Sequence, residues 1–324
     1  MITIHDIESA AERLKGVAVK TPLIWSPELD QRVGGRVYLK PECMQVTGSF
    51  KIRGAYNLMS RLSEEQSAKG VVAWSSGNHA QGVAAAGSML GIKAAIVMPE
   101  DAPKAKIDNT RRLGGETILY DRYTGDREAI AREIAAKRGA AIVPSYDHAH
   151  IIAGQGTVGL ELMAQAIEMG DLPDQVLVCC GGGGLIAGSA TAIKAANEST
   201  AVHPVEPVDF DDTARSLISG KTECNDSSAR SICDALQAHS PGEQTFAINR
   251  RLLERGLTVT DEEVREAMRF AFKHLKLIVE PGGAVALAAL LAKKIETRGR
   301  VSVAVLSGGN VDNELYNEIQ ANKR

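Results

Sequence analysis

The chain has 324 residues, of which 44% are hydrophobic, and a formal net charge of -3. This length suits one large or two moderate α/β domains, and the near-neutral charge argues against nucleic-acid or membrane partners. The five cysteines show no C-x-x-C spacing, so we expect reduced thiols and no zinc site. Neither a signal peptide nor a long apolar span is visible, and we therefore expect a cytoplasmic protein.

Strands and helices alternate along most of the chain. An amphipathic helix is expected over residues 4–15 and a strand over 37–40. Further on, strands are expected at 71–74, 94–98, 117–120 and 141–144, with helices that include 79–90 and 126–137. A strand at 175–180 precedes a helix at 185–194, and the proline-containing stretch 203–250 is predicted to be a long loop with short helices.

This alternation predicts an α/β protein with parallel sheets and helices on both sheet faces. We expect two such domains. A large domain would comprise residues 1–66 and 147–324, and a small domain, residues 67–146, would be inserted in its middle.

Four consecutive glycines, Gly181, Gly182, Gly183 and Gly184, lie between a predicted strand and a predicted helix. Without side chains they let several N–H groups approach one ligand, and the helix N-terminus behind them favours an anion. The alternative is a flexible turn. The segment lacks the Lys-Ser/Thr of a P-loop and the G-x-G-x-x-G spacing of a dinucleotide site, which leaves a small phosphorylated cofactor.

Lys51 is the sharpest candidate for chemistry. Two small residues, Gly48 and Ser49, and the aromatic Phe50 precede it, and an apolar helix follows. A lysine in this setting can be partly buried, which lowers its pKa toward nucleophilic use, although most lysines are solvated surface charges. Together with the distant glycine loop, Lys51 predicts a Schiff-base lysine that holds pyridoxal phosphate.

Five segments together resemble one enzyme family. They are S-F-K-I-R-G at 49–54, S-S-G-N-H-A-Q-G at 75–82, G-G-G-G-L at 181–185, V-E-P-G-G-A at 279–284 and S-G-G-N at 307–310. In this order they are similar to the fold type II pyridoxal-phosphate enzymes, whose fold is tryptophan synthase β-like. The nearest branch contains threonine/serine dehydratases and serine racemase, together with 3-hydroxyaspartate dehydratases. The resemblance implies pyridoxal 5'-phosphate as cofactor and a homodimer.

The resemblance also implies residue roles. Lys51 would form the Schiff base and take the proton from the substrate Cα, and Phe50 would lie against the cofactor ring. Asn78 would hydrogen-bond the ring hydroxyl, and Ser307 would face the pyridine nitrogen. The phosphate would be bound by Gly181, Gly182, Gly183, Gly184 and Leu185, and the substrate carboxylate by Ser75, Ser76, Gly77, Asn78 and His79. We also expect His79, His148 and His150 to be structural, and Cys179 and Cys180 to be buried strand residues.

The serine at position 307 has a chemical consequence. A hydroxyl cannot keep the pyridine nitrogen protonated as a carboxylate would, so chemistry with an early-departing leaving group is favoured. We therefore expect a lyase that converts a small hydroxyamino acid, L-threonine or L-serine, to the 2-oxo acid and ammonia by β-elimination. The alternatives are a 3-hydroxyaspartate dehydratase and a serine racemase with side elimination activity. A β-replacement synthase and a non-catalytic phosphate-binding protein are less compatible with the motifs, because the former's asparagine loop is not seen and the latter has no use for Lys51.

Two positions distinguish the first three alternatives. Ser76 is either a hydroxyl on the ring face opposite Lys51, as racemisation requires, or a helix N-cap. Arg127 either binds a second substrate carboxylate, which would indicate 3-hydroxyaspartate, or is a solvated arginine flanked by Asp126 and Glu128.

An acidic loop covers residues 205–212. In racemase-like relatives the matching positions bind a divalent cation, so the resemblance implies Mg²⁺, Mn²⁺ or Ca²⁺ at Glu206, the carbonyl of Phe210 and Asp212. Carboxylates combined with a carbonyl suit such hard cations. The alternative is a surface loop with a helix N-cap. Ala235, where a glycine is usual, and Gly282-Gly283 depart from the family pattern, which puts details of the substrate pocket in doubt.

Overall fold

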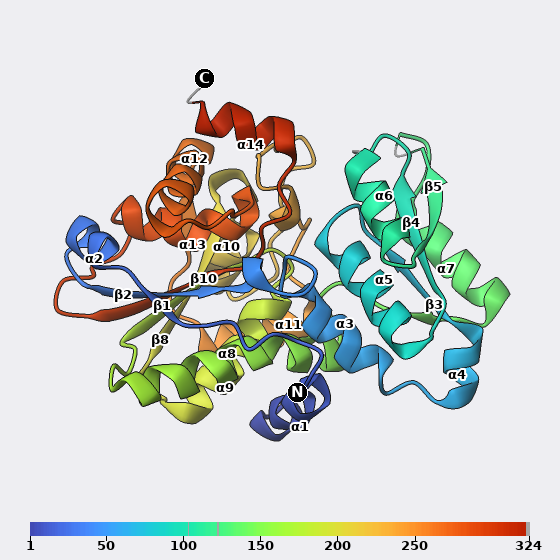
Figure 1. Cartoon of the computed structure of the whole chain (residues 1–324), viewed down its shortest axis with the longest axis horizontal. Coiled ribbons are helices and arrows are strands. Elements are labelled where there is room, and N and C mark those ends of the chain that lie inside the picture. The colour runs from blue at the N-terminus through green and yellow to red at the C-terminus, as the bar shows by residue number, and fades with distance from the viewer. Residues whose placement is uncertain (103, 122, 322–324) are drawn as a thin grey trace.

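The computed structural model describes residues 1–102, 104–121 and 123–321, and it contains two sheets (Figure 1). In the larger sheet, β1 is antiparallel to β2 and every other pair of neighbours is parallel. The smaller sheet is parallel throughout. The larger sheet has the spatial order β1 (Ile24–Trp25), β2 (Arg36–Pro41), β10 (Val301–Leu306), β7 (Gln175–Cys179), β8 (Ala201–Pro207) and β9 (Leu257–Val259). The smaller has the order β5 (Glu116–Tyr120), β4 (Ala94–Pro99), β3 (Val71–Trp74) and β6 (Ala141–Ile142).

Helices cover both faces of the larger sheet, and we call this sheet with its helices the larger body (Figure 1). On one face α13 (Pro281–Leu291) packs across β10, β7, β8 and β9, and α12 (Asp261–Phe270) packs against α13. On the other face α8 (Ala149–Met169) and α9 (Gly184–Ala196) pack along each other. The remaining helices of this body are α1 (Ile4–Leu14), α2 (Pro27–Val33), η1 (Glu42–Met44), α3 (Lys51–Met59), η2 (Val208–Phe210), α10 (Asp212–Ser219), η3 (Asp234–Leu236), α11 (Glu243–Leu252), η4 (Ala271–Leu275) and α14 (Asn313–Gln320).

The smaller sheet is also covered by helices on both faces, and we call it with its helices the smaller body. Alternate residues of its strands point to opposite faces and so pack against different helices. Ala73 and Ile96 belong to a core shared with α5 (Asn78–Leu90), whereas Val72 and Val97 belong to a core shared with α7 (Arg127–Arg138). The other helices near this sheet are α4 (Glu64–Lys69) and α6 (Lys104–Arg112). The fold is therefore α/β with two parallel-sheet layers flanked by helices, as the sequence predicts.

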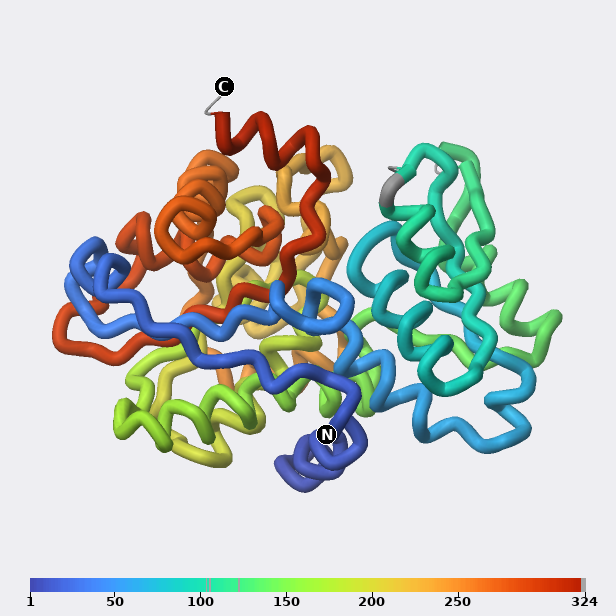
Figure 2. The backbone as a smooth tube through the Cα atoms, viewed as in Figure 1, coloured from blue at the N-terminus to red at the C-terminus, as the bar shows by residue number. Residues whose placement is uncertain are grey.

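The chain path joins the two bodies twice. The tube in Figure 2 shows the N-terminal and C-terminal parts of the chain together in the larger body, with the segment from β3 to β6 in the smaller one. The domain limits expected at residues 67 and 146 remain a prediction. Within the described residues, no helix is both long and apolar enough to cross a membrane.

The expected elements of the first 145 residues are confirmed to within a few residues, but the stretch 203–250 is more regular than expected. It contains the second half of β8, followed by α10 and by α11, which is ten residues long. The prolines misled the prediction. Pro204 is accommodated in β8 because β9 pairs with this strand only from Val205 onward, so no pairing on that side is lost at the proline.

Candidate active site

A cleft of about 780 Å³ is lined by residues of both bodies. Its walls include the segments that follow the carboxyl ends of β3, β7 and β10, which is where ligands bind in parallel α/β sheets. Every residue predicted from the sequence to bind cofactor or substrate lines this one cleft: Phe50, Lys51, Ser75, Ser76, Gly77, Asn78, His79, Arg127, Gly181, Gly182, Gly183, Gly184, Leu185 and Ser307. The three predicted cation ligands do not line it.

The glycine loop has no room for side chains. Gly183 has a φ of +90°, and a Cβ there would lie 2.7 Å from Nδ2 of Asn249. A Cβ at Gly182 would lie 2.5 Å from the ring of Tyr146. Gly183 is also the N-cap of α9 and provides no side-chain cap, so the first N–H groups of the helix are free to bind an anion. The loop therefore fits the phosphate of the predicted cofactor.

Lys51 is the first residue of α3 and is half-buried at the cleft. Its Nζ donates a hydrogen bond to the carbonyl of Ser145 at 2.9 Å, and it forms no ion pair with any described carboxylate. Burial lowers the pKa of Lys51 to about 8, although Cys179 and Glu280 act in the opposite direction. A lysine with these properties suits imine formation and proton transfer.

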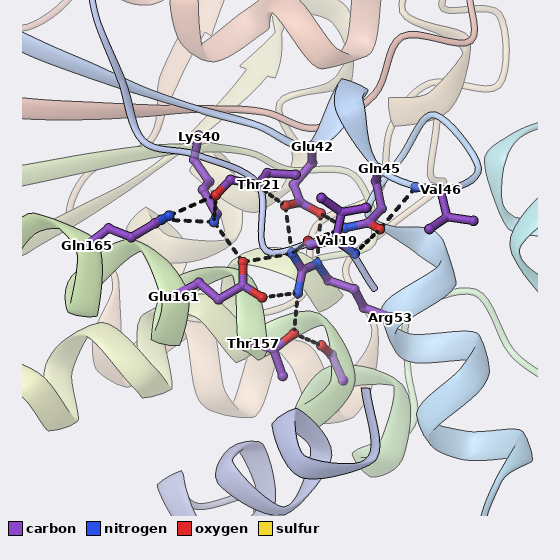
Figure 3. A network of polar contacts seen from close by, with 11 residues as sticks. Val19, Thr21, Lys40, Glu42, Gln45, Val46, Arg53, Thr157, Glu161 and Gln165 are labelled. Atoms are coloured by element: carbon purple, nitrogen blue, oxygen red, sulfur yellow. Dashed lines mark hydrogen bonds and ion pairs between the residues drawn. The ribbon is translucent and has the colours of Figure 1, made fainter. Parts of the chain in front are cut away.

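The helix that carries Lys51 is anchored by a buried polar network (Figure 3). The Arg53 guanidinium donates to both oxygens of Glu42, at 2.8 and 2.9 Å, and to both oxygens of Glu161, at 2.7 and 2.9 Å. Lys40 donates to Glu161 at 2.7 Å. We call Lys40, Glu42, Arg53 and Glu161 the Arg53 network. It ties the start of α3 to η1, β2 and α8, and so it fixes the position of Lys51, the first residue of that helix.

Asn78 and the two side chains that contact it form a second polar group. Asn78 Nδ2 donates to Glu280 Oε1 at 2.6 Å, and Asn310 Nδ2 donates to Asn78 Oδ1 at 2.7 Å. Glu280 is buried, and its pKa is raised to about 7 by burial and by the nearby Asp234. In the sequence, Glu280 and Asn310 stand out only as members of the segments 279–284 and 307–310. Their place in the V-E-P-G-G-A and S-G-G-N segments was the one signal that could have identified them as site residues.

Ser307 lies at the end of β10 and is buried, with the Cys179 thiol beside it. Burial raises the pKa of Cys179 to about 11, so this thiol stays protonated at neutral pH. Cys179 and Cys180 are buried as expected, but Cys179 also lines the cleft. Hence a serine hydroxyl and a neutral thiol, with no carboxylate, terminate the two central strands at this wall.

The segment Ser75–His79 turns from β3 into α5. The N-cap of α5 is Gly77, so the alternative interpretation of Ser76 as the helix N-cap is wrong. Because no side chain caps α5, its first N–H groups can bind a carboxylate. His79 makes a structural contact, since its Nε2 lies 2.8 Å from the carbonyl of Val143, and burial together with Lys51 lowers its pKa to about 3. His148 caps α8, also a structural role.

Arg127 is the first residue of α7 and is exposed on the cleft wall. The acidic neighbours that could have neutralised it are engaged elsewhere. The Asp126 carboxylate caps α7, and Glu128 pairs with Arg132 at 2.5 Å. No ion pair joins Arg127 to a described residue, so its guanidinium is available to a ligand in the cleft.

The acidic loop has a different environment from the cleft. Both oxygens of Glu206 accept backbone hydrogen bonds at the start of α10, from Thr213 at 3.0 Å and Ala214 at 2.8 Å. Asp212 Oδ1 accepts from Asn225 at 2.5 Å, whereas its buried Oδ2 has no partner. Burial raises the pKa of Asp212 to about 6 and, with Asp212 beside it, the pKa of Glu206. The described residues contain no cluster of three or more His, Cys, Asp or Glu suited to a metal, but two adjacent buried carboxyls with an unpaired oxygen remain compatible with a cation.

The two departures from the family pattern lie in contact. Ala235 lines the cleft, and a Cβ at Gly282 would lie 3.2 Å from the Cβ of Ala235. The glycine at 282 thus leaves space for the extra methyl group at 235.

Comparison with known proteins identifies relatives over almost the entire chain. The family model described as pyridoxal-phosphate dependent enzyme matches residues 14–308. The L-threo-3-hydroxyaspartate ammonia-lyase of Pseudomonas sp is 45% identical over 96% of this chain and 96% of that protein. The serine racemase of Schizosaccharomyces pombe is 42% identical over 97% of this chain and 96% of that protein. The crystal structure of a threonine deaminase from T.th. superimposes with a TM-score of 0.91 at 43% identity, covering 96% of this chain and 99% of that chain.

Proposed function

Because this chain belongs to the pyridoxal-phosphate dependent enzyme family, we propose that it is an ammonia-lyase acting on a small β-hydroxy amino acid, L-threonine or L-serine. The observation that carries the proposal is one cleft that holds Lys51 without a carboxylate partner, the glycine loop, and Ser307 in place of an acid. The net reaction converts the hydroxyamino acid to a 2-oxo acid and ammonia.

The cofactor fits the residues present, because the loop Gly181–Gly184 excludes side chains and leaves helix N–H groups free for its phosphate. Pyridoxal phosphate supplies, when bound, the electron sink that makes the substrate Cα proton acidic. Phe50 and Asn78 would hold its ring, and Ser307 would face the ring nitrogen. A neutral hydroxyl at this position keeps the sink weak, which favours departure of the β-hydroxyl over transamination.

Lys51 and the start of α5 do the remaining work in this proposal. The N–H groups at the N-terminus of α5, with the loop from Ser75 to Gly77, bind the substrate carboxylate and orient the Cα–H bond. Lys51 Nζ then accepts the Cα proton. Its pKa of about 8 leaves a substantial neutral fraction near neutral pH, which a general base requires.

The test measures 2-oxo-acid release by the purified enzyme from L-threonine, L-serine and the isomers of 3-hydroxyaspartate, in parallel and with Mg²⁺ present. We expect 2-oxobutyrate and pyruvate from threonine and serine. A Lys51→Ala variant that kept full turnover would refute the assignment of the base. Absence of any 2-oxo acid from all of these substrates would refute the lyase.

A second candidate substrate, 3-hydroxyaspartate, is favoured by one observation: Arg127 lies on the cleft wall without an ion-pair partner among the described residues. A guanidinium binds a carboxylate bidentately, and such bonds contribute more than neutral hydrogen bonds. In this case oxaloacetate formation should exceed formation of the other two products.

The matched variants are Arg127→Ala and Arg132→Ala. Arg132 also lines the cleft but is paired with Glu128. If Arg127 binds a second carboxylate, Arg127→Ala lowers kcat/KM for 3-hydroxyaspartate by about 10- to 100-fold and leaves serine and threonine nearly unchanged. Arg132→Ala should change neither. Equal effects of Arg127→Ala on all substrates would exclude the second-carboxylate role.

We also propose a divalent cation at Glu206, Asp212 and the Phe210 carbonyl, and a homodimer. The unpaired buried Oδ2 of Asp212 supports the cation. The thermal midpoint of chelator-treated protein should rise with added Mg²⁺ or Ca²⁺ in the wild type but not in Asp212→Asn. Light scattering of the eluted protein tests the dimer, and a monomeric mass would reject it.

A further inference from the structure

Glu280 and Asn310 lie on either side of Asn78 and contact opposite ends of its side-chain amide. Glu280 Oε1 accepts from Asn78 Nδ2 at 2.6 Å, and Asn310 Nδ2 donates to Asn78 Oδ1 at 2.7 Å. Asn310 Nδ2 is itself held by the carbonyl of Thr47 at 2.8 Å, so both of its N–H groups are used. All three side chains line the cleft, and Asn78 and Glu280 are buried.

These contacts determine the polarity of Asn78. A carboxylate can only accept and the anchored Asn310 can only donate, so turning the amide would place oxygen against oxygen and N–H against N–H. Nδ2 therefore keeps its position and retains one further N–H. At this position Asn78 therefore presents a hydrogen-bond donor, and not an acceptor, to a ligand in the cleft.

Among the described residues, the Glu280 carboxylate has no hydrogen-bond partner other than Asn78. Glu280 is the N-cap residue of α13, yet its carboxylate does not cap that helix. Its backbone N–H donates to the Gly308 carbonyl at 3.0 Å. A Cβ at Gly308 would lie 2.2 Å from Glu280 Oε1 and 3.2 Å from Asn78 Nδ2, so this glycine leaves the space in which the carboxylate and amide meet.

We propose that Glu280 and Asn310 are positioning residues that fix the Asn78 amide with its free N–H toward the ring oxygen of the bound cofactor. A fixed donor there stabilises that oxygen as an anion and thereby changes the absorbance of the bound cofactor. The inference rests on the proposed contact of Asn78 with the cofactor but on no particular substrate.

Protonation of Glu280 gives this arrangement a pH dependence. Burial and the nearby Asp234 raise the pKa of Glu280, while Asn78, Lys106 and Lys51 lower it. The net result is a pKa of about 7. The thiols of Cys43 and Cys179 also face this carboxyl group. In the anionic state Glu280 can only accept, which enforces the amide orientation. In the neutral state it can also donate, and the orientation is less strictly enforced.

The experiment measures cofactor binding to the apoenzyme, without substrate, for the wild type, Glu280→Ala, Glu280→Gln, Asn310→Ala and Asn78→Ala. We expect Glu280→Ala and Asn310→Ala to weaken binding about tenfold, and Glu280→Gln, which retains an accepting oxygen, to restore most of it. The absorbance of the bound cofactor is followed between about pH 5 and about pH 9, a range that brackets the titration. A step near neutral pH should appear in the wild type and in Asn310→Ala but not in Glu280→Gln.

Wild-type affinity and an unchanged absorbance spectrum in Glu280→Ala would overturn the proposal. So would an Asn78→Ala variant with normal cofactor binding, because there would be no contact to position. If Glu280→Ala does not fold, Asn310→Ala decides alone, since Asn310 is only half-buried. Absence of lyase activity would refute the proposed function and leave these binding measurements intact.

Discussion

Two lysines, Lys40 in β2 and Lys51 at the start of α3, differ in their partners. Lys40 is fully buried and uses its three N–H groups on Glu161 at 2.7 Å, Gln165 at 3.1 Å and the Thr21 carbonyl at 2.7 Å. Lys51 is half-buried and, among the described residues, its Nζ has one hydrogen-bond partner, the uncharged Ser145 carbonyl. Around Lys40 the charges of two cations and two carboxylates cancel within the Arg53 network. Around Lys51 no described carboxylate forms an ion pair that would neutralise the ammonium group.

The difference separates a structural cluster from a reactive one. In the Arg53 network burial alone would raise the pKa of Glu42, but Arg53, Lys40 and Thr21 together outweigh burial and lower it. At the cleft the opposite holds, and burial raises the pKa of Glu280. The buried Oγ of Ser49 and Oε1 of Gln155 also lack partners near Lys51. Groups that the fold leaves unpaired are those available to a ligand.

Separate replacement of each lysine is expected to give the largest difference between the two sites. Lys51→Ala should lower turnover by on the order of 10³-fold or more, because base and cofactor attachment are lost together. It should leave the thermal midpoint nearly unchanged. Lys40→Met should do the reverse, with a lower midpoint and a normal visible absorbance of the bound cofactor. Equal loss of activity in both variants would remove the distinction.

Replacement of Arg53, the centre of the Arg53 network, tests whether this network stabilises the fold. Arg53→Met leaves the buried carboxylate of Glu42 and the half-buried carboxylate of Glu161 without their main partner, which costs about 3–5 kcal/mol of unfolding free energy. Urea unfolding of the apoenzyme measures this loss. A change below about 1 kcal/mol would show that the network tolerates the loss of its centre.

The pH dependence of stability should differ in sign between the two clusters. The pKa of Glu280 is raised from 4.5 to about 7, so the folded apoenzyme loses stability as the pH rises through this window. Glu280→Gln removes that loss and should be more stable than the wild type by up to about 3 kcal/mol above pH 7, with no gain below about pH 4.5. The pKa of Glu42 is lowered, so its contribution is present at neutral pH and lost in acid. Glu42→Gln should therefore destabilise the protein at neutral pH, and a gain there would contradict the assignment.

A pair of glycine variants gives the smallest expected effect. Gly183→Ala and Gly299→Ala both place a methyl group at positive φ, +90° and +69°, at a cost of about 1–2 kcal/mol. Only Gly183 meets other atoms, Asn249 and Thr245, and only Gly183 lies in the cleft. Cofactor affinity should fall in Gly183→Ala alone, as measured by titration of the apoenzymes. Equal affinities would argue against phosphate binding by this loop.

The elements of the fold could be predicted well where apolar periodicity was regular, as in β3, β4 and α5. The prediction failed at β8, because its prolines suggested a loop, whereas pairing with β7 over residues 201–205 and with β9 over residues 205–207 stabilises the strand. Among the site residues, Lys51, the glycines and Ser307 could be found because each lies in a distinctive local segment. The role of Ser76 could not be assigned from the sequence. The N-cap of α5 lies one residue later, at Gly77, which excludes the capping role and leaves the hydroxyl on the ring face opposite Lys51 as a prediction.

The sequence by itself determined the family, the cofactor and the glycine loop, lysine and serine of the cleft, since these depend on short segments whose meaning is local. Only the tertiary structure decided which polar groups are paired. Asn78 meets Glu280 across 202 residues of chain and Asn310 across 232, and Arg53 meets Glu161 across 108. Hydrogen bonds and buried charges depend on distances of a few ångströms, which sequence spacing does not specify. The reactive environment of Lys51 and the neutralised environment of Lys40 are therefore consequences of packing, although the two lysines lie eleven positions apart in the chain.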